Sequence, residues 1–119
     1  MTSTGAVDRS VLDALFESLG GDQEFLVELL NTYFEDAPQL ITAMQAAVAA
    51  GDAEELRRAA HSLKSTSATF GAMDLSGQCK VLEMMAKSSA LQGAEAQIAA
   101  VATEYERAKA ELETVQRGS

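Results

Sequence analysis

The sequence predicts an all-α protein, an antiparallel up-down four-helix bundle with a short additional N-terminal helix. Apolar residues make up 47% of the 119 residues and recur at spacings of three and four, as on amphipathic helices. Alanine-rich stretches favour helix over strand. The glycines fall between the periodic stretches, where helices end. We expect one domain over residues 8–115, with flexible ends at 1–7 and 116–119.

The first two helices are expected at residues 8–19 and 22–50. The longer one carries an apolar stripe that keeps its phase across Pro38. We therefore expect a kink at Pro38, and a split into two helices is the alternative. The shorter helix has one apolar side, formed by Val11, Leu12, Leu15 and Phe16.

Three further helices follow after short turns. Gly51 supplies a C-cap, and Asp52 with Glu55 resembles a capping box that opens the third helix. The fourth and fifth are expected at 72–88 and 94–115. Because the turns between the long helices are short, neighbouring helices must pack antiparallel.

Charge and composition exclude several classes of partner. Eighteen acids against nine bases give a net charge of −9, which repels nucleic-acid backbones and anionic membrane surfaces. No apolar run approaches the roughly 20 residues that span a bilayer, and the first ten residues do not resemble a signal peptide. We expect a cytoplasmic protein, with the single cysteine, Cys79, as a core thiol.

His61, the only histidine, lies on the third predicted helix and points outward. At about 100° per residue, it falls roughly 150° from the centre of that helix's apolar stripe. A lone histidine on a helix is most often a residue without chemistry, so its surroundings matter. The apolar stripe consists of Leu56, Ala60, Leu63, Ser67 and Phe70.

Two local features favour a functional role for His61. Ser65 and Ala68 share its outward face and are small, so a second protein could approach the ring. Basic residues surround it on the helix, and such a positive island favours an anion. Pairing of the two arginines with Glu54 is the alternative. The basic residues are Arg57, Arg58 and Lys64.

The stretch "HSLKSTSATFGA", residues 61–72, resembles the signature of histidine-containing phosphotransfer (HPt) domains. That signature has a histidine, then any residue, leucine, lysine and a glycine or small residue. Several small residues follow, ending in an apolar residue and glycine. "GGDQEFLVELLNTYFEDAPQL" and "AAVAAGDAEELRRAAHSLK" resemble the family's second and third helices, so the resemblance covers residues 8–112. The one departure is Ser65, where the family most often has glycine; serine is small enough to preserve the approach.

The resemblance implies that His61 accepts a phosphoryl group on Nε2 in a multistep phosphorelay. The donor would be the phospho-aspartate of a receiver domain, and another receiver would accept the group. Family spacing puts Glu83 where a side chain hydrogen-bonds the histidine ring, so Glu83 is expected to hold Nδ1–H and orient the ring. Lys64, one turn from His61, is expected to neutralise phosphoryl charge. The alternative for Glu83 and Lys64 is a solvated surface side chain.

The expected partners are response-regulator receiver domains, with a hybrid sensor kinase as one candidate source. Their docking surface should include Arg57, Ser65 and Ala68, with Leu12 and Phe16 as an apolar rim. The sequence has no Gly-rich phosphate loop and no acidic metal cluster, so Mg²⁺ is expected on the partner receiver and no cofactor on this chain. We expect a monomer without kinase activity of its own.

Two other function classes compete with this interpretation. A non-catalytic helical adaptor would bind receivers without carrying phosphate. An enzyme using His61 as general base would need a pocket and a second catalytic group within hydrogen-bond distance. A metal site would need more ligands than one histidine and scattered acids.

Overall fold

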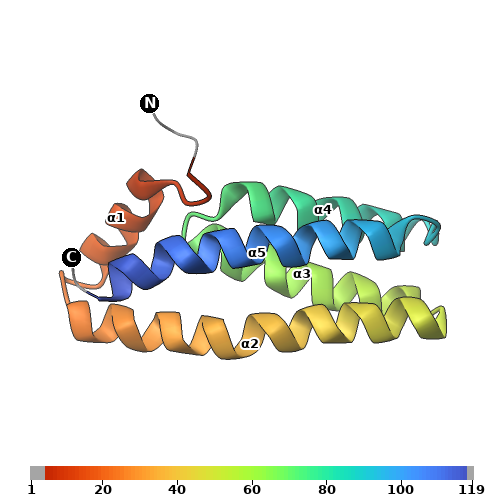
Figure 1. The fold of residues 1–119 in the computed structure, drawn as a ribbon, viewed down its shortest axis with the longest axis horizontal. Helices are drawn as coiled ribbons and strands as arrows, with labels where there is room; N and C mark the ends of the chain where they lie inside the picture. The colour runs from red at the N-terminus through yellow and green to blue at the C-terminus, as the bar shows by residue number, and fades with distance from the viewer. Residues whose placement is uncertain (1–4, 118–119) are drawn as a thin grey trace.

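The computed structural model describes residues 5–117, which form five helices and no strand. Four long helices pack side by side as an antiparallel bundle, each against the next along the chain, and the last returns to the first of the four (Figure 1). The short helix lies at the end of the bundle where the last helix also finishes (Figure 1). The predicted fold class is confirmed. The helices are α1 (Arg9–Ser18), α2 (Gln23–Ala50), α3 (Ala53–Thr69), α4 (Met73–Lys87) and α5 (Ala94–Gln116).

Three aspartates begin helices in the way short polar side chains do. Asp8, Asp22 and Asp52 each accept a hydrogen bond from a backbone N–H in the first turn of α1, α2 and α3. Gly51 ends α2 with a φ of 69°, a left-handed conformation that glycine adopts at little cost. Only half of the predicted capping box is present, because the Glu55 carboxylate pairs with Arg58.

α2 runs without interruption through Pro38, so the alternative of two helices is wrong. The ring of Pro38 lies on the exposed side, while Ala37 and Ile41 beside it are buried. Because the apolar stripe keeps its phase on both sides of the proline, burial against α3 and α5 holds the two halves in one helix.

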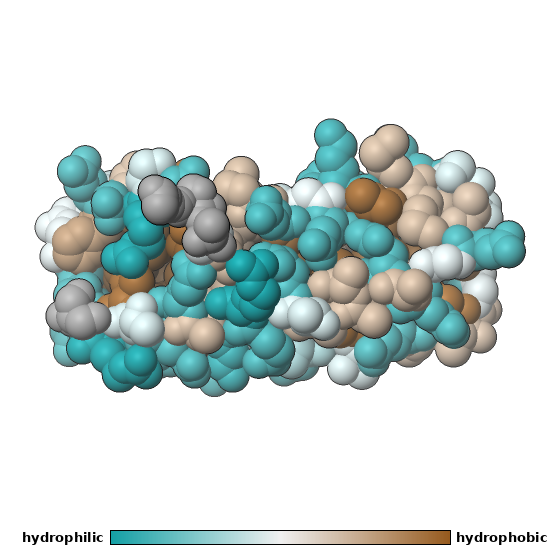
Figure 2. Space-filling view, turned by 45° about the horizontal axis from the view of Figure 1, so that its top comes forward, coloured by the Kyte–Doolittle hydropathy of each residue, from teal (hydrophilic) through white to brown (hydrophobic). Residues whose placement is uncertain are grey.

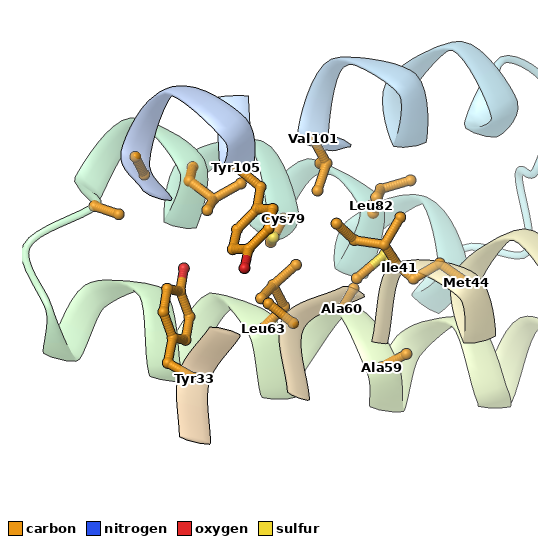
Figure 3. Close-up of a cluster of buried hydrophobic side chains, with 14 of the residues drawn as sticks. Tyr33, Ile41, Met44, Ala59, Ala60, Leu63, Cys79, Leu82, Val101 and Tyr105 are labelled. Carbon is orange, nitrogen blue, oxygen red and sulfur yellow. The ribbon is translucent and has the colours of Figure 1, made fainter. Parts of the chain in front are cut away.

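The core fills the space between the four long helices (Figure 3), and it includes a hydrogen-bonded pair of buried hydroxyl groups. The Tyr33 hydroxyl and the Ser67 hydroxyl share a hydrogen bond of 2.8 Å, both within the core. The Tyr33 ring also packs against Phe70 and Tyr105, with centroid separations of 5.0 and 5.8 Å. Burial raises the pKa of Tyr33 to about 12. Cys79 is buried in the same cluster.

The segment before α1 is packed rather than free, which corrects the domain boundary expected at residue 8. Ala6 and Val7 are buried, and their N–H groups donate to the Glu111 carboxylate on α5 at 2.5 and 3.2 Å. The Asp8 N–H donates to the carbonyl of Gly71 at 2.7 Å. Gly71 has a φ of +85°, and a Cβ there would lie 2.6 Å from the Asp8 carbonyl oxygen, so only glycine fits.

Flexible ends are expected at residues 1–7 and 116–119. Of these, residues 1–4 and 118–119 lie outside the part of the chain that the structure describes. At the C-terminal end, Gln116 still belongs to α5, and its side-chain amide donates to the Asn31 side chain at 2.6 Å. The packed domain therefore extends beyond residue 115. Across residues 5–117, no helix is both long enough and apolar enough to cross a bilayer.

Candidate functional site

His61 projects from the outward side of α3, and 57% of its side chain is exposed. The helix is fixed in this rotation by its opposite side, where Leu56 and Leu63 are fully buried. Burying a leucine side chain is worth about 1.5–3 kcal/mol, so turning α3 to bury the imidazole would lose far more than it gained. The ring is therefore held at the surface by the core residues around it.

Glu83 reaches the histidine from the neighbouring helix α4. Its Oε2 lies 2.9 Å from His61 Nδ1, and its Oε1 accepts a hydrogen bond of 2.6 Å from Lys64 Nζ. Only 14% of the Glu83 side chain is exposed. A third contact between the helices, from the Ser76 hydroxyl to the Lys64 carbonyl at 3.0 Å, holds α3 and α4 in this register. Glu83 and Lys64 are thus paired with each other and not simply solvated.

The contact to Glu83 sets the tautomer of the histidine. An ionised carboxylate only accepts hydrogen bonds, so a neutral imidazole must carry its proton on Nδ1. Nε2 then holds the free lone pair, on a ring that is more than half exposed. This is the protonation pattern that an imidazole nucleophile requires.

Lys64 favours the ionised form of Glu83. The Lys64 ammonium, hydrogen-bonded to Glu83, holds the pKa of that carboxyl below its usual range, and the bond to His61 acts in the same direction. Partial burial of Glu83 opposes these effects without reversing them. At neutral pH Glu83 therefore accepts from both His61 and Lys64.

The predicted positive island around His61 is partly neutralised. Arg57 donates two hydrogen bonds to Glu54, and Arg58 donates to Glu55 at 2.8 Å. The expectation that Glu54 pairs with both arginines is wrong for Arg58, because Glu55 lies three residues before it on the same side of the helix. Exposed pairs of this kind contribute little and exchange readily with solvent or a partner.

The residues expected to form the docking floor lie on the His61 side of α3. Ser65 is exposed and Ala68 is half-buried. Neither is long enough to stand between the imidazole and an approaching protein. Arg57, on the same side one turn before His61, is half-buried and tied to Glu54.

The apolar rim expected on α1 is wrong for Leu12. That side chain is 2% exposed, because α1 lies across the bundle end and turns its apolar side into the core. Phe16 is half-buried and lines a hollow of about 130 Å³ at the α1 end, together with Leu26 and Val115 but no residue of α3. Leu12 is therefore a core residue, and the docking role of the half-buried Phe16 stays a prediction.

Three of the four exposed large apolar side chains among the described residues lie instead on α4, and the fourth, Phe25, lies near the start of α2. Met73, Val81 and Met84 have large exposed apolar side chains. A helical wheel of the predicted fourth helix would have placed all three away from its apolar stripe, so the signal was available.

The arrangement contains one oriented nucleophile, the Nε2 atom of His61. Among residues 5–117, no group of three or more His, Cys, Asp or Glu side chains could hold a metal ion. A hollow of about 630 Å³ lies around residues 5–10, Gly71 and Glu111, and His61 is not among the residues that line it. Neither of the two hollows described is lined by His61, whose ring projects from α3.

Two comparisons with known proteins agree with this geometry. The family model described as Hpt domain matches residues 28–114, a stretch that includes His61, Lys64 and Glu83. The crystal structure of histidine-containing phosphotransfer protein B (HptB) from Pseudomonas aeruginosa PAO1 superposes with a TM-score of 0.88 at 34% sequence identity, covering 98% of this chain and 99% of that one. Among curated proteins, none matches the sequence significantly. The exposed, oriented histidine, the helical bundle and the family match together show that the chain belongs to the Hpt domain family.

Proposed function

We propose that this protein is a phosphoryl carrier that accepts a phosphoryl group on His61 Nε2 from the phospho-aspartate of one receiver domain and passes it to another. The observation that carries the proposal is the bond between His61 Nδ1 and Glu83, which leaves Nε2 as the nucleophile on an exposed ring. Membership of the Hpt family supports the reaction class, because Hpt domains serve in phosphorelays as carriers and not as kinases.

The transfer exchanges one bond for another. The Nε2 lone pair attacks phosphorus, and the bond between phosphorus and the aspartyl oxygen breaks, so the aspartate leaves as a carboxylate. The imidazole gains a positive charge while Nδ1 keeps its proton. Glu83, already ionised and 2.9 Å from Nδ1, stabilises that charge as it develops. The reverse exchange delivers the group to a second receiver.

Lys64 would make one contact before the transfer and another during it. Before transfer its ammonium is bonded to Glu83, one turn from His61. As the phosphoryl oxygens arrive, they compete with Glu83 for that ammonium, and Lys64 supplies positive charge to them. Mg²⁺, which phosphoryl transfer commonly uses, would come with the receiver. We propose no kinase activity for the chain itself, and its cytoplasmic location and monomeric state stay predictions.

The test uses a panel of purified receiver domains charged with acetyl phosphate and Mg²⁺. Each is mixed with the wild-type protein and, separately, with the His61→Gln variant. We expect acid-labile, base-stable phosphate on the wild type alone. Because His61 is exposed, the variant should melt within about 2 °C of the wild type. ATP without a receiver should give no label.

Two results would contradict the proposal. Equal label on His61→Gln would place the phosphate on another residue. Receiver binding without label on the wild type would favour the adaptor alternative, in which the bundle binds receivers and carries nothing.

A further inference from the structure

A phosphoryl group on His61 adds negative charge to a chain in which eighteen acidic residues already outnumber nine basic ones. Hydrophilic residues cover most of the face shown in Figure 2, so a charged group added to such a surface has water and polar side chains as neighbours. Phosphoryl oxygens form their strongest contacts with arginine and lysine. The basic residues of α3 therefore decide how a phosphorylated His61 is held.

Arg57 and Arg58 of α3 differ in their position relative to His61. At about 100° per residue, Arg57 falls about 40° from His61, on the side where Lys64 contacts α4. Arg58 falls about 60° from His61 on the other side. Side chains on a helix lean toward its N-terminus, so the imidazole leans over the turn that precedes it. Arg57 is thus the arginine beside the ring on the α4 side.

The register of α3 and α4 places Arg57 level with Glu83. The Ser76 hydroxyl donates to the Lys64 carbonyl at 3.0 Å, so these two residues lie opposite each other. Glu83 comes seven residues after Ser76. Because the helices are antiparallel, its level on α3 is seven residues before Lys64, which is Arg57. The hydrogen bonds to Glu54 raise the pKa of the Arg57 guanidinium, and the negative charge of Glu83 raises it further.

A carboxylate occupies Arg57 in the structure. Arg57 Nε and Nη2 donate to the two carboxylate oxygens of Glu54 at 3.2 and 2.5 Å. A guanidinium offers the same two-pronged geometry to a phosphoryl group. The Glu54 side chain is 68% exposed, so the pair is open to solvent and contributes little to stability. A phosphoryl group carries more negative charge than a carboxylate and competes with it for the same donors.

We propose that Arg57 exchanges Glu54 for the phosphoryl group when His61 is phosphorylated. Arg57 then holds the phosphoryl group from the turn before the ring, and Lys64 holds it from the turn after. Glu54 occupies the guanidinium while the histidine is unmodified. The proposal rests on the proposed function, in which His61 carries the group. It differs from the receiver contact expected of Arg57, because it requires no partner protein.

The test labels His61 without a receiver and follows the phosphoryl group by phosphorus-31 NMR. Potassium phosphoramidate is the donor: Nε2 attacks phosphorus, the phosphorus–nitrogen bond of the reagent breaks, and ammonia leaves. His61 is the only histidine, so one phosphohistidine resonance is expected. Its titration with pH gives the midpoint at which the phosphoryl group gains its second negative charge. A guanidinium in contact favours the doubly charged form and lowers that midpoint.

The main comparison is between Arg57→Gln and Arg58→Gln, because both arginines form an exposed ion pair at the same helix spacing. We expect Arg57→Gln to raise the midpoint by about half a pH unit. Arg58→Gln should raise it by no more than about 0.2, since its charge is more distant and screened. Arg57→Lys keeps the charge without the two-pronged geometry, so its midpoint should lie between those of Arg57→Gln and the wild type.

Glu54→Gln tests the exchange itself. The midpoint should fall, because Arg57 no longer has a carboxylate to leave. The fall should be smaller when Glu54→Gln is combined with Arg57→Gln, since the effect of Glu54 acts through Arg57. Melting temperatures of all variants should stay within about 2 °C of the wild type, because exposed ion pairs contribute little to stability.

Three results would overturn the proposal. Equal midpoints for Arg57→Gln and the wild type would show that Arg57 does not contact the phosphoryl group. Equal shifts from Arg57→Gln and Arg58→Gln would show a general effect of charge. An unchanged midpoint in Glu54→Gln would remove the exchange. Failure of the proposed function looks different: phosphoramidate would label the wild type and no receiver would, while the midpoints would still decide the role of Arg57.

Discussion

The inner and the outer side of α3 each make a polar contact of similar length to a neighbouring helix. Loss of the inner contact and loss of the outer one would have different consequences. On the inner side Ser67 bonds Tyr33 of α2 at 2.8 Å, and on the outer side His61 bonds Glu83 of α4 at 2.9 Å. Ser67 is fully buried, whereas the imidazole is more than half exposed. A buried hydroxyl that lost its partner would cost stability, whereas an exposed ring would only lose its orientation. The contact that supports stability and the contact that supports chemistry therefore point about a third of a turn apart around the same helix axis.

On the inner side of α3, the substitution expected to destabilise the protein most is Leu63→Ala. Leu63 is fully buried two residues after His61, and its loss should cost about 2–5 kcal/mol of unfolding free energy through lost burial and a cavity. Urea denaturation measures this cost, with the exposed neighbour Ser62→Ala as control. Phosphoryl acceptance below the melting transition should stay close to wild type. A destabilisation no larger than that of Ser62→Ala would mean that α3 is rotated from the position described.

A smaller effect on stability is expected from the buried polar pair. Ser67→Ala leaves the Tyr33 hydroxyl buried without its partner, at a cost of about 1–3 kcal/mol. Tyr33→Phe alone should also destabilise, but the double variant should be less destabilised than the sum of the two. A double-mutant cycle from denaturant melts measures the coupling. Strict additivity would show that the hydrogen bond contributes nothing.

On the outer side of α3, the orienting role of Glu83 is tested by comparing two variants of this residue. Glu83→Ala removes the acceptor for His61 Nδ1 and should slow phosphoryl acceptance about 10–100-fold, as loss of other orienting contacts does. Glu83→Gln should recover part of the rate, since its amide oxygen still accepts from Nδ1 but carries no charge to stabilise the imidazolium. Rapid-quench transfer assays measure both, and melting temperatures should change little. Equal rates for Glu83→Ala and the wild type would leave Glu83 without an orienting role.

The smallest expected effect is on the titration of Glu83. Lys64→Met removes the main cause of its lowered pKa, so the pKa of Glu83 should rise toward its usual range. Carbon-13 NMR of the side-chain carboxyl follows the titration, with Lys80→Met as control. Because the folded pKa is lowered, this contact stabilises the wild type above the unfolded-state pKa and is lost as pH falls through the folded value. An unchanged midpoint in Lys64→Met would mean that the 2.6 Å contact does not persist in solution.

Much of the fold could be predicted, because the spacing of apolar residues that indicates a helix is found within a short stretch of sequence. The spacing of apolar residues predicted all five helices, and Gly51 and Asp52 predicted where α2 ends and α3 begins. The outward direction of His61 followed from the same periodicity. The state of Pro38 could not be settled this way, because a single helix and two coaxial helices have the same apolar stripe.

Several contacts between different parts of the chain could be identified only from the tertiary structure. Leu12 was expected at the surface, and only the placement of α1 across the bundle end buries it. The packing of Ala6 and Val7 depends on Glu111, more than a hundred residues away. The pairing of Lys64 with Glu83 depends on how α3 and α4 are set against each other.

The sequence by itself determined the helices, the apolar side of each, and a single histidine turned away from the core. Glu83 was expected opposite that histidine only through the family resemblance, whereas its pairing with Lys64 and the identity of the exposed apolar residues were decided by the tertiary structure. The physical reason is that periodicity defines the direction of a side chain relative to its own helix axis. The neighbour it meets depends on the spacing and register of a second helix, which local sequence does not contain.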